Sequence, residues 1–188
     1  MTRTLQRPAT YDDLLKVPDH LVAEIVEGEL FTSPRPGKPH ERAGGAIFSA
    51  LLQAFDHGIN GPGGWRVAFE PEIHLAGDVF VPDVAGWHTA RATEDEDHIA
   101  AWTIAPDWVC EVISPSTGRL DRLRKMPAYA RRGVTNAWLV DPSLHTIEAY
   151  RLEQSRWVLL GTFGDEPANI EPFEAIEFPI QTLWLPSA

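Results

Sequence analysis

The chain has 188 residues, of which 44% are apolar and 23% are charged, values that are typical of one globular domain. We therefore expect a single domain over residues 1–188. The one cysteine, Cys110, excludes a disulfide framework and a multi-cysteine zinc site. A formal charge of −11 excludes a surface that broadly attracts nucleic acid. Because no apolar run is long enough to cross a membrane and the N-terminus lacks a signal-peptide core, we expect a cytoplasmic protein without membrane segments.

The N-terminal third predicts a short helix, a hairpin and a long helix. Thr10 and Asp13 have the spacing of a capping box, which places the start of the short helix at Thr10. Apolar and polar side chains alternate along residues 23–32 on both sides of Gly28, a pattern that predicts a β-hairpin with a tight turn. After a proline-rich loop, residues 41–55 carry apolar side chains at helical spacing, which predicts the first long helix.

The pattern in the rest of the chain predicts mostly short strands. A β-meander is expected in three runs, at residues 65–70, 71–77 and 78–87. Residues 89–98 predict a loop or one helical turn, and residues 117–132, closed by Gly133, predict the second long helix despite Pro127. The tail from residue 170 to 185 shows no regular pattern. Further strands are expected at residues 106–114, 136–141, 145–152 and 156–163. This order predicts an α/β fold with a mixed β-sheet flanked by helices.

Two carboxylates stand where apolar side chains are expected. Glu111 lies at the centre of the apolar run 108–113, and Asp83 interrupts the run 78–87. A buried carboxylate needs a lysine, an arginine or a metal ion beside it, because an unpaired buried charge is costly. Taken alone, each residue is explained more simply as a salt-bridged or solvent-facing strand residue. Together, on neighbouring strands, they predict a site for a hard divalent cation, Mg²⁺ or Mn²⁺.

Two other Pro-Asp pairs compete with Pro82-Asp83 for this role. Asp107 lies four residues before Glu111. That spacing is about 13 Å along an extended strand, so the two side chains cannot share one ion. Asp19 lies in a polar turn with no apolar run around it. Asp83 is therefore the better partner for Glu111.

The order of these polar residues is similar to that of a known family. The matching positions are Pro82-Asp83, residues 111–116, Arg122, Lys125, Tyr129, Gly133-Val134 and residues 138–142, with residues 23–30 and His40 nearer the N-terminus. Over about residues 10–152 the chain resembles the restriction-endonuclease-like bacterial family of the PD-(D/E)XK nuclease superfamily. The resemblance implies a restriction-endonuclease-like core, Mg²⁺ dependence and hydrolysis of phosphodiester bonds, with Asp83 and Glu111 as catalytic metal ligands.

The catalytic lysine departs from the superfamily pattern. That pattern has a lysine two residues after the acid, where this chain has Ile113. The resemblance implies that Lys125, on the following helix, takes over the role. Helical periodicity opposes this, because it predicts an apolar stripe of Leu120, Leu123, Pro127 and Ala130 with Lys125 on the opposite side. Pro127 relieves the conflict if it bends the helix or moves its start to about Leu120.

Three more residues are candidates for the site. Glu24 matches an acid that the family carries before its hairpin turn, and a third carboxylate would complete a cation shell. The alternative is an ordinary glutamate on a strand face. His40 is either an accessory group at the mouth of the site or a surface residue, and Tyr129 is a further accessory position. Glu70 and Glu72 flank a proline and are expected on a hairpin surface.

Basic side chains gather between residues 119 and 132, either as a solvated helix face or as a nucleic-acid contact. On the second interpretation Arg122 and Arg132 bind nucleic acid. The favoured function is a metal-dependent endonuclease that acts on DNA. The alternative is a catalytically inactive nuclease-fold module that binds nucleic acid or a protein partner. A homodimer is expected only by analogy with restriction-type nucleases, which pair two sites to cut two strands.

Overall fold

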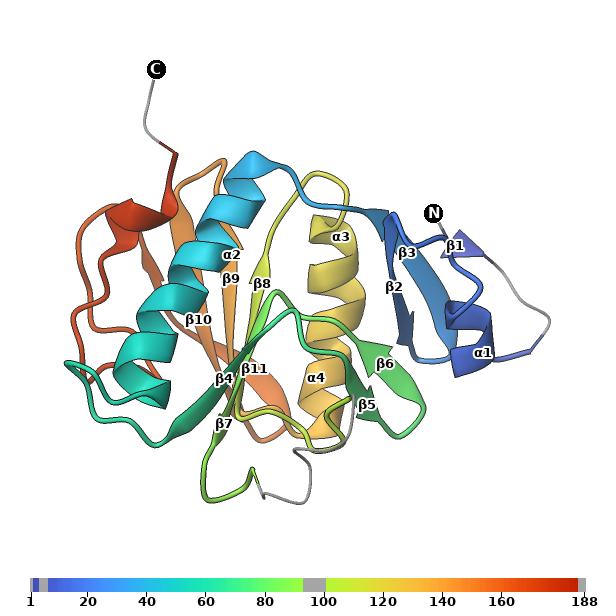
Figure 1. Ribbon diagram of the computed structural model, residues 1–188, viewed down its shortest axis with the longest axis horizontal. Coiled ribbons are helices and arrows are strands. Elements are labelled where there is room, and N and C mark those ends of the chain that lie inside the picture. The colour runs from blue at the N-terminus through green and yellow to red at the C-terminus, as the bar shows by residue number, and fades with distance from the viewer. Residues whose placement is uncertain (1, 4–6, 93–100, 186–188) are drawn as a thin grey trace.

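The computed structural model describes residues 2–3, 7–92 and 101–185. The larger of its sheets is mixed, as the sequence predicts, and forms the centre of the molecule (Figure 1). In spatial order its strands are β11 Arg156–Phe163, β10 Thr146–Glu153, β9 Asn136–Asp141, β8 Trp108–Val112, β7 Val84–His88 and β4 Trp65–Phe69. β8 and β9 are parallel because a helical crossover joins them, and the other neighbours are antiparallel.

A smaller antiparallel sheet stands beside the first. Its spatial order is β1 Thr2–Arg3, β3 Glu29–Pro34, β2 Leu21–Val26, β6 Asp78–Phe80 and β5 Ile73–Leu75. β2 and β3 are the predicted hairpin, and Glu27 and Gly28 have φ values of 54° and 75°, as a primed two-residue turn requires. The short helix α1, Tyr11–Leu14, begins with the predicted capping box, in which the Thr10 N–H donates to Asp13 at 3.1 Å.

The single meander predicted for residues 65–87 is wrong. The chain leaves the larger sheet after β4, adds β5 and β6 to the smaller sheet, and returns to the larger sheet as β7. Pro82 has no N–H to donate to a ladder, so the predicted run 78–87 breaks there into β6 and β7. This break places Asp83 at the junction of the two sheets.

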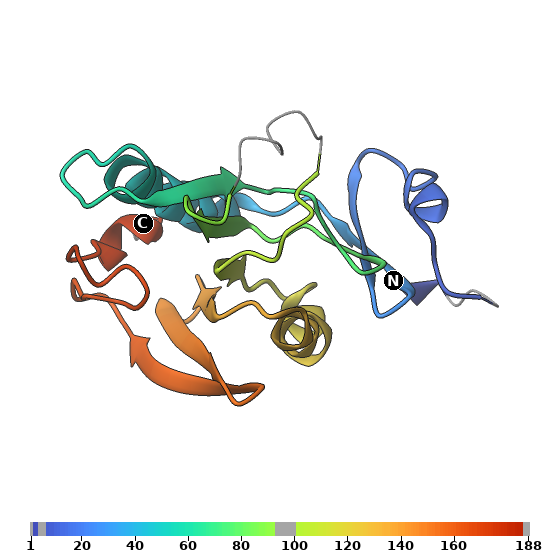
Figure 2. The same cartoon turned by 90° about the horizontal axis from the view of Figure 1, so that it is seen from below.

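Helices cover both faces of the larger sheet (Figure 2). On one face lies α2, Lys38–Leu51, which continues through the π-helical turn η1, Leu52–Asp56, and packs Ile47 and Leu51 against Trp108 and Trp138. The C-terminal tail joins this face with Phe173 and with the short 3-10 helix η4, Ile180–Leu183, whose first and last side chains are buried although the sequence predicts no element. The other face is covered by α3 Gly118–Leu120, η3 Asp121–Lys125 and α4 Met126–Arg132.

The second long helix is present, but its predicted orientation is wrong. Leu123, expected in the apolar stripe, is 54% exposed, whereas Lys125 is only 2% exposed. The buried side chains Asp121, Lys125 and Tyr129 recur every fourth residue, so the helix turns its polar stripe toward the sheet instead of the predicted apolar stripe. Gly133 ends the helix with a φ of 84°, as expected for a residue after the last turn.

The structure also bears on the predicted loop, on the absence of membrane segments and on the single cysteine. Residues 89–92 form a turn, whereas residues 93–98 of the predicted loop lie outside the described part of the chain. Within the described ranges, no helix combines the length and apolar character that crossing a membrane requires. Cys110 is buried and free in the core between α2 and the sheet.

Candidate active site

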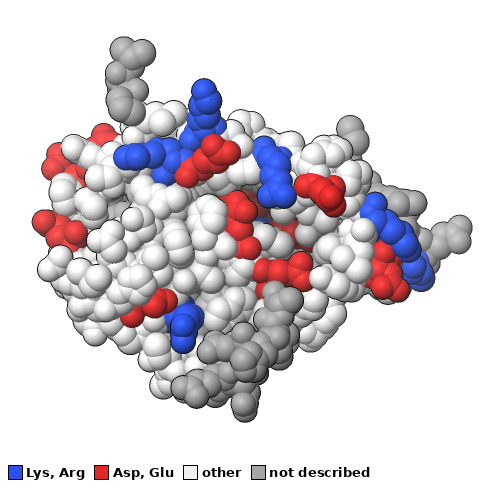
Figure 3. Space-filling model, in the orientation of Figure 1, with Lys and Arg blue, Asp and Glu red and all other residues white. Residues whose placement is uncertain are grey.

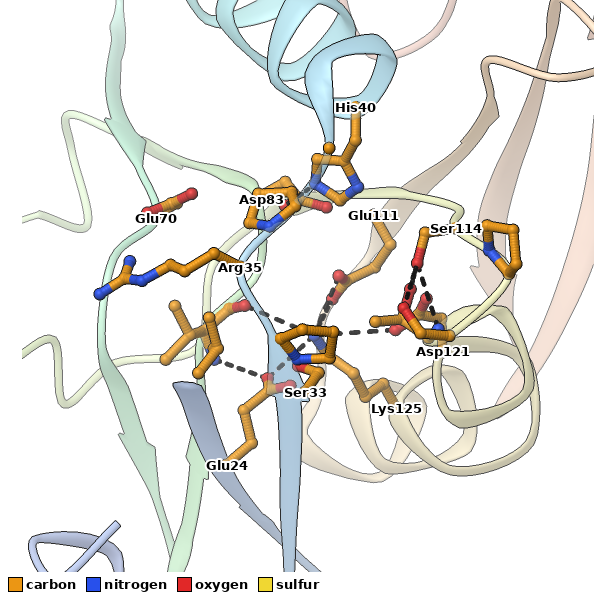
Figure 4. Close-up of a pocket in the computed structure, with 18 residues that line it drawn as sticks. Glu24, Ser33, Arg35, His40, Glu70, Asp83, Glu111, Ser114, Asp121 and Lys125 are labelled. Atoms are coloured by element: carbon orange, nitrogen blue, oxygen red, sulfur yellow. Dashed lines mark hydrogen bonds and ion pairs between the residues drawn. The ribbon is translucent and has the colours of Figure 1, made fainter. Parts of the chain in front are cut away.

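A pocket of about 210 Å³ opens where the two sheets meet, and it gathers polar side chains from both (Figure 4). Of the residues singled out from the sequence, it is lined by Glu24, His40, Asp83, Glu111 and Lys125. They come from β2, the start of α2, the β6–β7 link, β8 and η3. Segments that are distant in the chain therefore converge on one cavity.

Glu111 is the carboxylate at the base of this pocket. Side chains alternate along β8, so Trp108, Cys110 and Val112 face α2 while Glu111 faces the opposite helix. Its side chain is 3% exposed in the folded chain. The Lys125 Nζ lies 2.8 Å from Oε1, and the Tyr129 hydroxyl donates to the same oxygen at 2.5 Å. Burial raises the pKa of Glu111 well above its usual value, although Lys125 lowers it, and the neighbouring carboxylates raise it further.

Asp83 is fixed by two hydrogen bonds that tie it to both neighbouring elements. Its Oδ2 accepts the Val112 N–H at 2.6 Å, next to Glu111 on β8. Its Oδ1 lies 2.6 Å from Nε2 of His40, at the first turn of α2. His40 is thus not an ordinary surface residue but the direct partner of Asp83.

Lys125 is the cation at the centre of the cluster. Its Nζ lies 2.9 Å from Glu24, 2.8 Å from Glu111 and 4.0 Å from Asp121. Burial alone would lower the pKa of Lys125, but these carboxylates outweigh it and raise the pKa well above its usual value. The side chain is therefore held as an ammonium.

Glu24 is placed by the smaller sheet. It lies on β2, and its Oε1 accepts the Val81 N–H at 2.8 Å and pairs with Lys125. With 5% exposure, its carboxylate is buried rather than spread on a strand surface. The hairpin therefore contributes to the pocket directly.

Two acidic residues that the sequence analysis did not assign to the site also line the pocket. Asp121 is 3% exposed, and burial together with the Glu24 and Asp83 carboxylates raises its pKa to about 6, against the effect of Lys125. The only local signal was its position one turn before Lys125. Glu70, expected on a hairpin surface, lies at the end of β4, and its N–H donates to the Asp83 carbonyl at 3.0 Å.

The remaining candidates lie outside the lining of this pocket. Tyr129 is buried beneath Glu111, with its ring against Phe80. Arg122 pairs with Glu148 at 2.8 Å, and Arg132 donates to Asp78 at 2.6 and 2.9 Å. Both arginines that were predicted to bind nucleic acid therefore form ion pairs with carboxylates of the same chain.

The donor atoms in the pocket suit a hard cation, because they are mainly carboxylate oxygens. Within residues 2–3, 7–92 and 101–185, no three acidic, histidine or cysteine side chains stand together as a closed metal cage. Mg²⁺ needs no such cage, since it binds through one or two carboxylates and completes its shell with water and phosphate. Asp83 and Glu111 line the same pocket and are carboxylates of the type that such an open site uses.

Comparison with known proteins shows the family to which the chain belongs. The model of the Uma2 family, described as "Putative restriction endonuclease", matches residues 8–181. The chain belongs to this family. Among solved structures it is similar to the crystal structure of "a putative nuclease belonging to DUF820" from Anabaena variabilis, with 23% identity, a TM-score of 0.73 and coverage of 94% of this chain and 97% of that one. That likeness confirms the predicted fold of the Uma2 chain. No curated protein matches it.

Proposed function

We propose that this chain is a divalent-metal-dependent endonuclease that hydrolyses phosphodiester bonds in DNA, with Mg²⁺ or Mn²⁺ as its cofactor. The observation that carries the proposal is the convergence of Asp83, Glu111 and Lys125 on one pocket from three separate segments. A pair of carboxylates beside a buried ammonium provides both a place for a cation and a positive group for a phosphate. Membership of the Uma2 family supports the same reaction class.

Asp83 and Glu111 would hold the metal ion, with Glu24 as a third acidic group nearby. When bound, such an ion activates water and neutralises charge on the phosphate. The electrostatics of the pocket support this role, because neighbouring carboxylates raise the pKa of Glu111 in addition to its burial. A cation relieves that repulsion, so the protein itself provides a driving force for metal binding.

Lys125 would act on the phosphate as a fixed positive charge. Because its pKa is raised, Nζ keeps its proton at neutral pH and is a poor proton acceptor. An ammonium placed in a buried pocket stabilises the negative charge that develops during phosphoryl transfer. Glu24 and Glu111 hold Nζ in position on two sides, which limits its motion before substrate arrives.

The acidic surface sets the conditions for DNA binding. Figure 3 shows acidic side chains around the middle of one face and basic side chains along its upper part. Because the formal charge of the chain is −11, long-range attraction to DNA is weak, and binding depends on local cations and on salt. A homodimer, which would place two sites on two strands, stays a prediction.

The alternative is an inactive nuclease-fold module that binds nucleic acid or a protein. One observation favours it: Lys125 and Tyr129 already satisfy the Glu111 carboxylate, so a metal ion has to compete with them. Metal titration separates the two functions. A module without a metal role shows no binding of Mn²⁺ that depends on Asp83.

The direct test is cleavage of supercoiled plasmid and of single-stranded DNA at low salt with Mg²⁺ or Mn²⁺. We expect nicking or cutting by the wild type and none by Asp83→Asn prepared in the same way. Asp19→Asn is the matched control, because it changes another Pro-Asp pair on an exposed turn. Cleavage by Asp83→Asn at the wild-type rate, or no cleavage by the wild type with either metal ion, would contradict the proposal.

A further inference from the structure

The basic side chains divide into two groups by their partners. Many are paired with carboxylates within the chain, including Arg122 and Arg132. Others have no carboxylate partner among the described residues; these are Arg35, Lys38, Arg42, Arg66, Arg119 and Arg156. A phosphate binds an unpaired guanidinium without first breaking an ion pair, so the second group holds the available phosphate contacts.

One unpaired arginine lies at the pocket described above. Arg35 is exposed on the link between β3 and α2 and lines that pocket. Its hydrogen bond is to the backbone oxygen of Asp19 at 3.2 Å, which leaves other guanidinium N–H groups open. Figure 4 shows its side chain extending away from Lys125, toward the side opposite Asp121.

A second unpaired arginine lies beyond the other side of the pocket. A neighbouring hollow between β3 and the α3–η3 segment adjoins the pocket and shares Ser33, Ser116 and Thr117 with it. We refer to the pocket and this hollow together as the groove. Arg119 lines this hollow and is exposed. Leu123, 54% exposed, adds an apolar surface to the same hollow.

We propose that this groove carries one nucleic-acid strand across the active site, with Arg35 binding a backbone phosphate on one side of the scissile group and Arg119 on the other. The inference rests on the proposed function and specifies its substrate path. The pocket between the two arginines is rich in carboxylates, which repel the flanking phosphates unless a local cation receives them. Arg35 and Arg119 therefore replace Arg122 and Arg132 as the expected phosphate contacts.

The test uses fluorescence anisotropy with a labelled DNA of mixed sequence, single-stranded and duplex, in EDTA over a series of salt concentrations. Losing one phosphate contact lowers the slope of log K against log salt by about 0.7 for single strands and about 0.9 for duplex. We expect that reduction, with weaker binding, in Arg35→Ala and in Arg119→Ala. Arg122→Ala is the matched control, since it removes the same charge three residues from Arg119.

The outcomes separate this proposal from the proposed function. The proposed strand path is wrong if the wild type binds DNA and both Arg35→Ala and Arg119→Ala keep its salt slope. It is also wrong if Arg122→Ala lowers the salt slope as much as these two variants do. A wild type that binds no DNA also overturns it. A wild type that binds through both arginines but never cleaves with Mg²⁺ or Mn²⁺ keeps the path and overturns the nuclease. Arg119→Lys should retain the wild-type slope.

Discussion

The Lys125 Nζ lies 2.8 Å from Glu111 Oε1, although the apolar stripe predicted for residues 120–130 places Lys125 on the side away from the sheet. The helix buries its polar face, since Asp121, Lys125 and Tyr129 are buried at intervals of four residues while Leu123 is exposed. Lys125 also ends the π-helical turn η3. Such turns interrupt regular α-helical bonding and occur often at functional sites. The buried polar face of this helix thus supplies the lysine that the strand after Glu111 lacks.

Because Lys125 compensates several buried carboxylates, its removal should destabilise the protein strongly. Lys125→Met is expected to lower the free energy of unfolding by about 3–5 kcal/mol, as for a broken buried ion pair. Urea denaturation monitored by tryptophan fluorescence measures the change. Lys38→Met is the control, because Lys38 is exposed and its substitution should cost less than about 0.5 kcal/mol.

A double variant tests whether that loss comes from the unpaired carboxylate. Adding Glu111→Gln to Lys125→Met should restore part of the stability, because it removes one of the charges left without a partner. Mn²⁺ should raise the melting temperature of Lys125→Met more than that of the double variant. If the loss in free energy of unfolding for the double variant equals the sum of the losses for the two single variants, Lys125 and Glu111 are not directly coupled.

Asp121 should make stability fall as pH rises. Folding raises its pKa from an ordinary value of about 4 to about 6, so the folded state binds this proton more tightly. The stabilisation that comes from this tighter proton binding is therefore fully present below about pH 4 and is lost as pH rises through about 6. Asp121→Asn should be more stable than wild type at about pH 8, by on the order of 2–3 kcal/mol. Melting curves from pH 5 to 8 check this, with exposed Asp165→Asn as the control.

Local sequence patterns predict the elements of this fold better than their pairing. The apolar run around Glu111 predicts β8, and Gly28 predicts the hairpin, because each signal lies within a few residues. The second sheet was missed because strands with similar patterns, such as β4 and β5, differ only in their distant partners. Pro82 marks the break between β6 and β7, but its residue type does not say which sheet each strand joins.

The site was predictable to a similar extent. Glu111 and Asp83 stand out because a carboxylate is unusual in an apolar run. Asp121 and Glu70 carry a weaker signal, since Asp121 lies in a mixed, arginine-rich segment and Glu70 lies beside Pro71 at the end of a strand. The pocket that surrounds them forms only when the sheets meet. The orientation of Lys125 was mispredicted because this helix turns a polar face toward the pocket, whereas the periodicity argument assumes that the apolar face is buried.

His40 should support metal binding through Asp83. Its Nε2 lies 2.6 Å from Asp83 Oδ1, and its Nδ1 is buried with no hydrogen-bond partner within the described part of the chain. Loss of a partner that orients a metal-binding carboxylate costs about 10- to 100-fold in affinity. We expect that loss for Mn²⁺ with His40→Ala, measured by calorimetry. His57→Ala, at an exposed histidine, should bind as the wild type does, and equal affinities for all three proteins would contradict the role.

Tyr129 should hold Glu111 through a single hydrogen bond. The hydroxyl donates to Oε1 at 2.5 Å, and both groups are buried. Tyr129→Phe keeps the ring against Phe80 but removes the donor, so the free energy of unfolding should fall by about 1.5–3 kcal/mol, as for a bond to a charged group. Tyr150→Phe is the matched control, because the Tyr150 hydroxyl donates to Glu148 at a half-buried position. Its removal should lower the free energy of unfolding by less.

The same substitution should also strengthen metal binding once stability is accounted for. With the hydroxyl gone, Glu111 Oε1 has one donor fewer and is freer to coordinate a cation, while Lys125 still fixes the side chain. We therefore expect a larger rise in melting temperature with Mn²⁺ for Tyr129→Phe than for wild type or Tyr150→Phe. A smaller rise would mean that the Tyr129 hydroxyl orients Glu111 for the metal ion instead of competing with it.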